Sequence, residues 1–411
     1  MTESSAEVER RFPSRNFLII VVSWMIWSPV HNMIWTYEPL YIKALGASST
    51  ILGLIYAVSG AVLAFSRLPG GYIADRFGRR KLIIVMSHLY AASYFLYALA
   101  PDWRLILVAA ILGNVFLVYE PALSAIVADS VPPEVRGLSY GLSTFLPGVV
   151  SLAAPLVSGY MVSAYGLVGG MRIIYALGAG LALLACFLRF LFLQETHRGV
   201  VERRPLIADF FSGYREAFVF LGERIPFIVF LFVFAAFAEG AQAFVSPYAV
   251  EYLGIPENLW YQVYMAFSVA NLVLTAILSY FIDRVGRRNV GLVSSLIFIF
   301  SMPAYVLITP RCRNVMQYAA LVLSLVMASY RALWNVASTL IADFVPRERR
   351  GRIITLVFSI HSLSLSASRF LCGVLYDAVS PGSPFLFASV SMVFAFMVIV
   401  FWLREPERRE F

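Results

Sequence analysis

Four long apolar stretches of this 411-residue chain contain side chains that could move a proton or hold a polar ligand. One has His31 and Trp35 four residues apart, and another has Glu239 and Gln242 three apart, spacings that put each pair on one helix face. Histidine titrates near neutral pH, and a glutamate in an apolar setting holds a proton more readily than in water. Proton binding and release is therefore the first chemistry that the sequence suggests.

The other two stretches add aromatic, acidic and basic groups. Tyr119 and Glu120 are adjacent in one of them. The other carries three residues at helical spacing: Arg331, Trp334 and Asn335. Because Arg331 stays protonated at any accessible pH, it could pair with Glu120 or Glu239, or hold an anionic group of a ligand.

The same side chains also allow structural interpretations. Glu120 and Arg331 could form a purely structural ion pair, and His31 could simply bond a backbone carbonyl. We expect Glu38 at the outer headgroup level, and Arg67 and Arg369 as gating or packing partners. Three aromatic residues could form an apolar wall for a lipophilic compound: Trp35, Tyr119 and Trp334.

Composition decides where this chemistry takes place. The chain is 60% hydrophobic and 14% charged, with a mean hydropathy of +0.78, which excludes an ordinary water-soluble protein. The net charge of +8 would suggest nucleic acid in a soluble chain, but the basic residues lie mostly in short loops, and no nucleic-acid partner is expected. Neither the three cysteines nor the four histidines have the spacing of a metal site, and we expect neither metal, cofactor nor enzymatic activity.

Twelve stretches are long enough to cross a bilayer as helices. They are residues 17–40, 50–69, 82–100, 104–128, 137–164, 172–193, 226–249, 258–281, 290–309, 314–342, 352–378 and 384–403. We therefore predict an all-α polytopic membrane protein with 12 transmembrane helices. The helices divide into six-helix bundles at residues 1–193 and 226–411, with the charge-rich segment 194–225 as a cytoplasmic linker.

The basic residues predict the orientation. When a residue at the first position of a span is counted with its loop, 23 of the 32 Lys and Arg residues fall on the side of the termini, five on the opposite side, and four within spans. Because basic loops stay in the cytoplasm, both termini are predicted to be cytoplasmic, in a multi-pass plasma-membrane protein surrounded by lipid.

An internal repeat relates the two bundles. Asp75-Arg76-Phe77-Gly78-Arg79-Arg80 returns 208 positions later as Asp283-Arg284-Val285-Gly286-Arg287-Arg288. A second pair of segments, residues 124–137 and 338–351, shares further residues at an offset of 214, among them Asp129/Asp343, Pro132/Pro346, Glu134/Glu348 and Arg136/Arg350. The offset of 208 also relates His31 to Glu239, which makes this pair our first candidate for proton coupling. The halves are therefore predicted to be pseudo-symmetric.

With these motifs, the chain resembles the major facilitator superfamily over nearly its whole length. The segment from Gly71 to Lys81 is similar to that family's signature loop between its second and third helices. The resemblance implies alternating access around a central cavity, with Asp75 docking on the eleventh helix as a gate. It assigns gating roles to Gly71, Asp75, Arg76, Gly78, Arg79, Arg80, Asp283, Arg284, Gly286 and Arg287.

The resemblance also implies the function. The expected protein is a secondary active transporter of a small organic solute, driven by the proton gradient and acting as a monomer. Export by proton antiport is favoured, although the Gly- and Pro-containing segment from Gly141 to Gly159 is only partly similar to the drug and proton antiporter branch. The alternatives are a proton symporter that imports a sugar or an organic anion held by Arg331, and, less favoured, a non-transporting membrane sensor.

Overall fold

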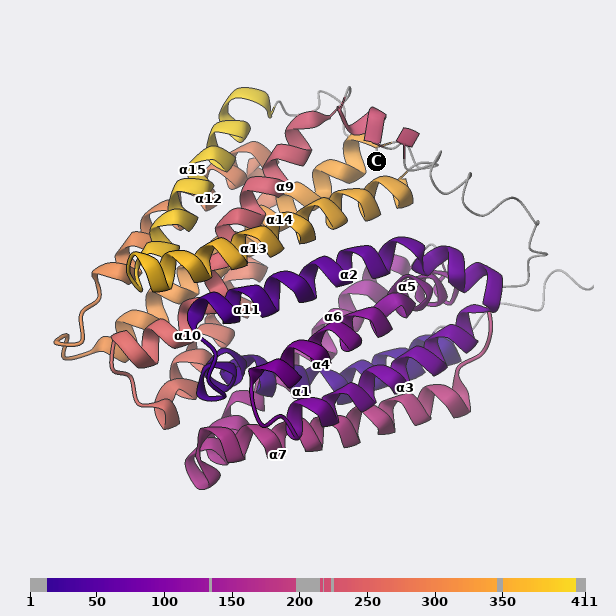
Figure 1. Ribbon diagram of the computed structural model, residues 1–411. Coiled ribbons are helices and arrows are strands. Elements are labelled where there is room, and N and C mark those ends of the chain that lie inside the picture. Colours follow the sequence, from indigo (N-terminus) through magenta and orange to yellow (C-terminus); the bar gives the residue numbers. More distant parts are fainter. Residues whose placement is uncertain are drawn as a thin grey trace, which may run out of the picture.

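The first half of the chain is a helical bundle. The computed structural model describes residues 13–132, 135–196, 215–216, 218–222, 225–345 and 350–403, and none of these forms a strand. The helices of the first half are α1 (Arg15–Ala44), α2 (Ser49–Phe77), α3 (Arg79–Ala98), α4 (Trp103–Phe116), α5 (Glu120–Asp129), α6 (Arg136–Ser151) and α7 (Ala154–Phe192), with a short turn, η1 (Leu117–Tyr119), between α4 and α5 (Figure 1).

The second half repeats this architecture. It contains α9 (Pro226–Glu239), η3 (Gly240–Phe244), α10 (Val245–Pro247), η4 (Tyr248–Tyr252), η5 (Glu257–Leu259), α11 (Trp260–Val285), α12 (Arg287–Leu307), α13 (Val315–Phe344), α14 (Arg350–Ala378) and α15 (Ser383–Trp402). Most of the predicted linker, including residues 197–214, lies outside the described residues.

These elements form the twelve predicted crossings. The segments α4, η1 and α5 make one crossing, with Pro121 in the first turn of α5, where its missing N–H costs no hydrogen bond. The long helix α7 contains parts of two crossings, because Gly166 has a φ of +71° and interrupts the helix. The segments from α9 to η4 together make the seventh crossing.

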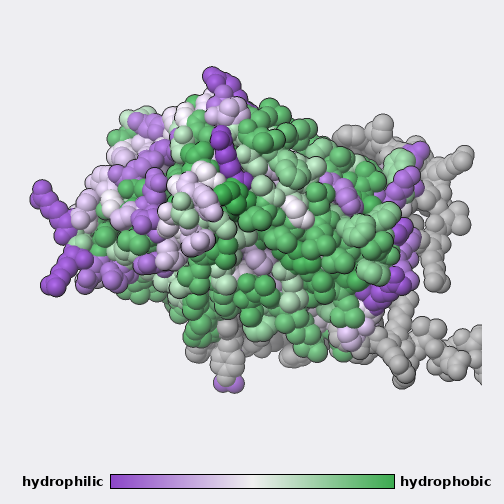
Figure 2. All heavy atoms as spheres, turned by 90° about the horizontal axis from the view of Figure 1, so that it is seen from below, coloured by the Kyte–Doolittle hydropathy of each residue, from purple (hydrophilic) through white to green (hydrophobic). Residues whose placement is uncertain are grey.

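The surface is that expected of a membrane protein. Figure 2 shows a broad apolar band between two hydrophilic ends. By length and composition, ten helical stretches within the described residues qualify as membrane spans, and one of them, Leu138–Phe192, contains the break at Gly166. Apolar side chains on this band suit contact with the hydrocarbon core of a bilayer, as the mean hydropathy of the sequence predicted.

Glycines allow the two halves to pack closely through α2 and α14, which lie side by side (Figure 1). A Cβ atom at Gly53 would lie 2.5 Å from the Arg369 carbonyl oxygen, and one at Gly60 would collide with the Ser366 hydroxyl. Further along α2, Gly70 instead packs against Val118, in its own half. The helix α2 therefore contacts the other half mainly through its first part.

Candidate functional site

A cavity of about 1210 Å³ lies between the two halves. Its wall includes His31, Trp35 and Glu38 from α1, Glu120 from α5, Gln242 from η3, Arg331 from α13 and Arg369 from α14. Both halves thus contribute ionisable side chains to one cavity. Because an intramembrane charge is costly unless it has a function or a partner, these residues are the candidate site.

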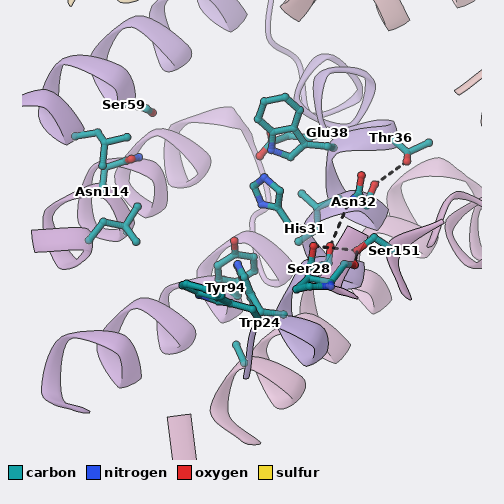
Figure 3. Close-up of a pocket in the computed structure, with 18 of the residues that line it drawn as sticks. Trp24, Ser28, His31, Asn32, Thr36, Glu38, Ser59, Tyr94, Asn114 and Ser151 are labelled. Carbon is teal, nitrogen blue, oxygen red and sulfur yellow. Dashed lines mark hydrogen bonds between the residues drawn. The ribbon is translucent and has the colours of Figure 1, made fainter. Parts of the chain in front are cut away.

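Glu38 lies in the wall of this cavity, on the side formed by the first half. Its Oε2 accepts a hydrogen bond from the Tyr56 hydroxyl (3.1 Å) and its Oε1 accepts one from Tyr175 (3.0 Å). The Tyr175 ring stacks on Tyr97, with centroids 4.8 Å apart. The sequence-based placement of Glu38 at the outer headgroup level is therefore replaced by a position in the cavity (Figure 3).

His31 lies on the same wall, between two tryptophans. Its ring centroid is 6.4 Å from that of Trp27 and 5.3 Å from that of Trp35. None of the hydrogen bonds found within the described part of the chain involves His31, so the suggested bond to a carbonyl is not seen. Trp35 is 48% exposed and lines the cavity, and its role as an aromatic wall for a ligand stays a prediction.

Glu239 belongs to a hydrogen-bonded network within the second half. It accepts a hydrogen bond from the Tyr330 hydroxyl, and its Oε2 lies 3.4 Å from His361 Nε2. The hydroxyl of Tyr330 is also 3.3 Å from that His361 nitrogen. Glu239 is not among the described residues of the cavity wall, so the structure does not bring it together with His31 in one cavity.

Sequence reasoning missed two members of this network, Tyr330 and His361. The ionisable one of the pair near neutral pH is His361. Its side chain is only 8% exposed and lies on α14 within an apolar span. A buried histidine in such a span was the available signal, but its sequence neighbours gave no indication of an acidic partner.

The arginines of the cavity pair differently from the prediction. Arg67 Nε donates to Glu120 Oε2 at 2.6 Å, so Glu120 is paired within the first half rather than with Arg331. Arg331 forms no ion pair with a described residue and faces the cavity. Tyr119 also lines the cavity and is 7% exposed.

The remaining predicted residues of the second half separate into two groups. Gln242 lines the cavity, and its buried Nε2 lacks a hydrogen-bond partner. Trp334 instead stacks on Phe358, with centroids 5.5 Å apart, and does not line the cavity. Asn335 is likewise absent from the described wall. Helical spacing placed these residues near the site but did not decide which of them face the cavity.

The signature loop forms a tight turn at the end of the bundle where α1 begins. Gly78, with φ of +91°, ends α2 and precedes α3, and Gly286, with φ of +95°, does the same between α11 and α12. Arg79 Nη1 donates to Asp129 Oδ2 (2.6 Å), and Arg80 donates to the carbonyls of Phe190 and Leu193. These contacts join the loop to α5 and α7 within one half.

Other members of the predicted gate are only partly described. Gly71 lies in α2 and faces Pro121, and the Arg76 guanidinium lies over the Phe77 ring. Arg284 is the penultimate residue of α11, and Arg287 begins α12. The side chains of Asp75 and Asp283 lie outside the described residues, and the docking of Asp75 on the eleventh helix stays a prediction.

Metal chemistry has no support in the part of the chain that the structure describes. No group of three or more His, Cys, Asp and Glu side chains there could hold a metal ion. The cysteines at 186, 312 and 372 are free thiols.

Relatives with known names are transporters. The chain is 26% identical over 306 residues to the multidrug resistance protein MdtG of Enterobacter lignolyticus, covering 70% of each chain. It is 25% identical over 412 residues to MdtG of Citrobacter koseri, covering 96% of each.

Solved structures share the fold. A mutant of the nucleoside transporter NupG matches with a TM-score of 0.78 at 13% identity, over 95% of this chain and all of the other (100%). A D-xylose–proton symporter matches with a TM-score of 0.76 at 16% identity, over 95% and 98% of the two chains. The sequence model of the Major Facilitator Superfamily matches residues 17–330 and 228–411. This protein therefore belongs to the major facilitator superfamily of membrane transporters and is not an enzyme.

Proposed function

We propose that this protein exports a small organic solute across the plasma membrane in exchange for protons. The observation that carries the proposal is the network of Glu239, Tyr330 and His361, a carboxylate and an imidazole within 3.4 Å inside an apolar bundle. Such a pair can share, take up and release a proton. Relatives named as multidrug resistance proteins support export. No cofactor is needed, since the proton gradient supplies the energy.

Contacts between the halves support alternating access. Lys43 pairs with Glu251 at 2.7 Å, and Thr50 donates hydrogen bonds to Asp377. The Trp260 indole N–H also donates to the Thr36 carbonyl. These contacts lie at the end of the bundle opposite the start of α1. With cytoplasmic termini, they would close the cavity on the outside, and their release would open it.

Proton symport of an organic anion is the second candidate. Arg331 favours it, because this guanidinium faces the cavity without an ion pair within the described residues and could hold a carboxylate. A bound anion would favour protonated carboxylates nearby, so that solute and proton would move together.

Proton movement in liposomes tests both candidates. Purified protein is reconstituted with an internal pH dye under an imposed proton gradient, and lipophilic cations, sugars and organic acids are added in turn. Antiport predicts solute-dependent proton flux opposite to the solute, lost in Glu239→Gln and retained in the exposed control Arg104→Gln. His31→Ala shows whether the cavity histidine contributes. Solute flux without proton movement, unchanged in both site variants, would overturn proton coupling.

A further inference from the structure

Four charged side chains of the cavity wall have no ion-pair partner among the described residues: Glu38, Arg189, Arg331 and Arg369. Of the charged residues in its wall, Arg67 and Glu120 neutralise each other at 2.6 Å. Arg189 is buried and donates to the Ser23 hydroxyl. Arg369 lies over the Tyr56 ring, beside Glu38. Glu38 in the first half and Arg331 in the second half are the two opposite charges that no described residue pairs directly and that face the cavity. An uncompensated charge in a low-dielectric cavity is costly, so each is a position for an opposite charge on a ligand.

The surroundings of Glu38 suit an ammonium group on an aromatic compound. Tyr56 and Tyr175 fix its two oxygens from α2 and α7, and each oxygen keeps a free lone pair. The stacked rings of Tyr97 and Tyr175 stand beside it, and both line the cavity. Aromatic faces attract organic cations and pack against flat apolar bodies.

The second half offers hydrogen-bond donors instead. Arg331 faces the cavity from α13, and Gln242 Nε2 is buried in the wall without a partner. A buried donor without a partner carries a desolvation cost that a ligand acceptor would remove. A carboxylate is a planar acceptor that a guanidinium and an amide N–H can bind together.

Arg369 is the alternative counter-ion for Glu38. Its guanidinium carbon lies 5.3 Å over the Tyr56 ring, and its buried Nε has no hydrogen-bond partner. The same tyrosine therefore contacts both the Arg369 guanidinium and the Glu38 carboxylate, and these two charges attract each other without a direct ion pair. Because Glu38 lines the cavity and has no direct ion pair among the described residues, its carboxylate remains available to an ammonium group of a ligand.

We infer that the cavity binds an aromatic zwitterion, with its ammonium on Glu38 and its carboxylate on Arg331. Each charged group of the ligand would be held by a different half of the protein. The ligand would therefore contact both of the halves that move relative to one another in alternating access. A ligand with one charge would provide a counter-charge to only one of Glu38 and Arg331. The inference deepens the proposed function, on which it rests for the cavity being the transport site.

Four probes with one naphthalene body test it. They are an aminomethyl-naphthoate (zwitterion), an aminomethyl-naphthamide (cation), a methyl-naphthoate (anion) and a methyl-naphthamide (neutral). Binding to the purified, detergent-solubilised protein is measured by calorimetry at neutral pH with no gradient. The zwitterion should bind about tenfold or more tighter than either singly charged probe, because each pole gains a charge-assisted hydrogen bond. Equal or tighter binding of a singly charged probe, or no binding of any probe, would overturn the inference.

Substitutions at the two residues test which of them binds the ammonium group and which binds the carboxylate. Arg331→Gln should weaken the zwitterion and the anion by about tenfold or more and leave the cation unchanged, whereas Glu38→Gln should weaken the zwitterion and the cation only. Arg331→Lys should restore part of the anion affinity, and Arg104→Gln should bind as the wild type does. If either site variant fails to fold, the relative affinities of the four probes for the wild-type protein still test the inference. Because no gradient is used, absence of proton coupling in liposomes would leave this result standing.

Discussion

At the scale of single residues, the signature turn depends on the backbone freedom of glycine. Gly78 has a φ of +91°, and a Cβ there would lie 3.2 Å from Glu195 Oε2. Arg80 donates its backbone N–H to the same carboxylate, so this acidic side chain has little freedom to move away. The turn therefore excludes side chains for both conformational and steric reasons.

We predict that Gly78→Ala lowers the free energy of unfolding by roughly 1–2 kcal/mol, the cost of a left-handed conformation for an L-residue. Reversible unfolding in SDS–detergent mixtures measures it. The matched control is Gly141→Ala, in helix α6, where no atom lies within 4 Å of the added Cβ, and which should be neutral or slightly stabilising. An equal loss in both variants would contradict the conformational explanation.

At the scale of elements, the α2–α14 contact is the main junction between the halves. Gly53 on α2 approaches the Arg369 carbonyl, and Gly373 on α14 approaches the Ser49 carbonyl, each with 2.5 Å to an added Cβ. Such backbone contact leaves no room for a methyl group, and overpacking typically costs 1–3 kcal/mol. In the alternating access that we propose, opening of this end would separate α2 from α14 and break the contact.

Gly53→Ala is therefore expected to favour opening at the end that we propose is external. A cysteine at Ser59, in the cavity wall, in a background without the three native cysteines, reports opening through its reaction with a membrane-impermeant maleimide. The rate should rise by roughly tenfold or more in Gly53→Ala. It should stay constant in Gly180→Ala, where the added methyl group meets open space. An unchanged rate in Gly53→Ala would show that this contact does not hold the closed state.

At the scale of the whole molecule, the pseudo-symmetry appears in an ion pair. Lys43 and Glu251, paired at 2.7 Å, are 208 positions apart, the offset of the repeated motif. The pair thus joins equivalent positions of the two halves. Tyr376 supports it, since the Lys43 ammonium lies 5.0 Å from the centre of that ring.

We predict that Lys43→Ala and Glu251→Ala each raise external labelling of the cysteine at 59, by at most about fivefold, because a partly exposed ion pair contributes up to roughly 1 kcal/mol. The exchanged double variant, Lys43→Glu with Glu251→Lys, should return the rate toward that of the parent. Additive increases in the double variant would mean that the two side chains do not act as a pair.

The fold was predictable because its signals are local and repeated. Long apolar runs must become helices in a membrane, since no water is present there to satisfy the backbone, and all twelve spans follow from this rule. The glycine of each signature turn was predictable for the same reason, because the chain reverses between two spans at Gly78 and again at Gly286. The transporter family followed from these motifs and is confirmed by the family match.

The partners within the site were decided only by the tertiary structure. Helical spacing gives the face on which Glu239 or Glu120 lies, but not which neighbouring helix that face meets. Glu239 bonds Tyr330, 91 residues away, and lies beside His361, whereas Glu120 takes Arg67 instead of the expected Arg331. A few degrees of helix rotation exchange one partner for another at little cost to the apolar packing that the sequence encodes. Only the assembled bundle therefore fixes which charges are neutralised and which, such as Arg331, face the cavity.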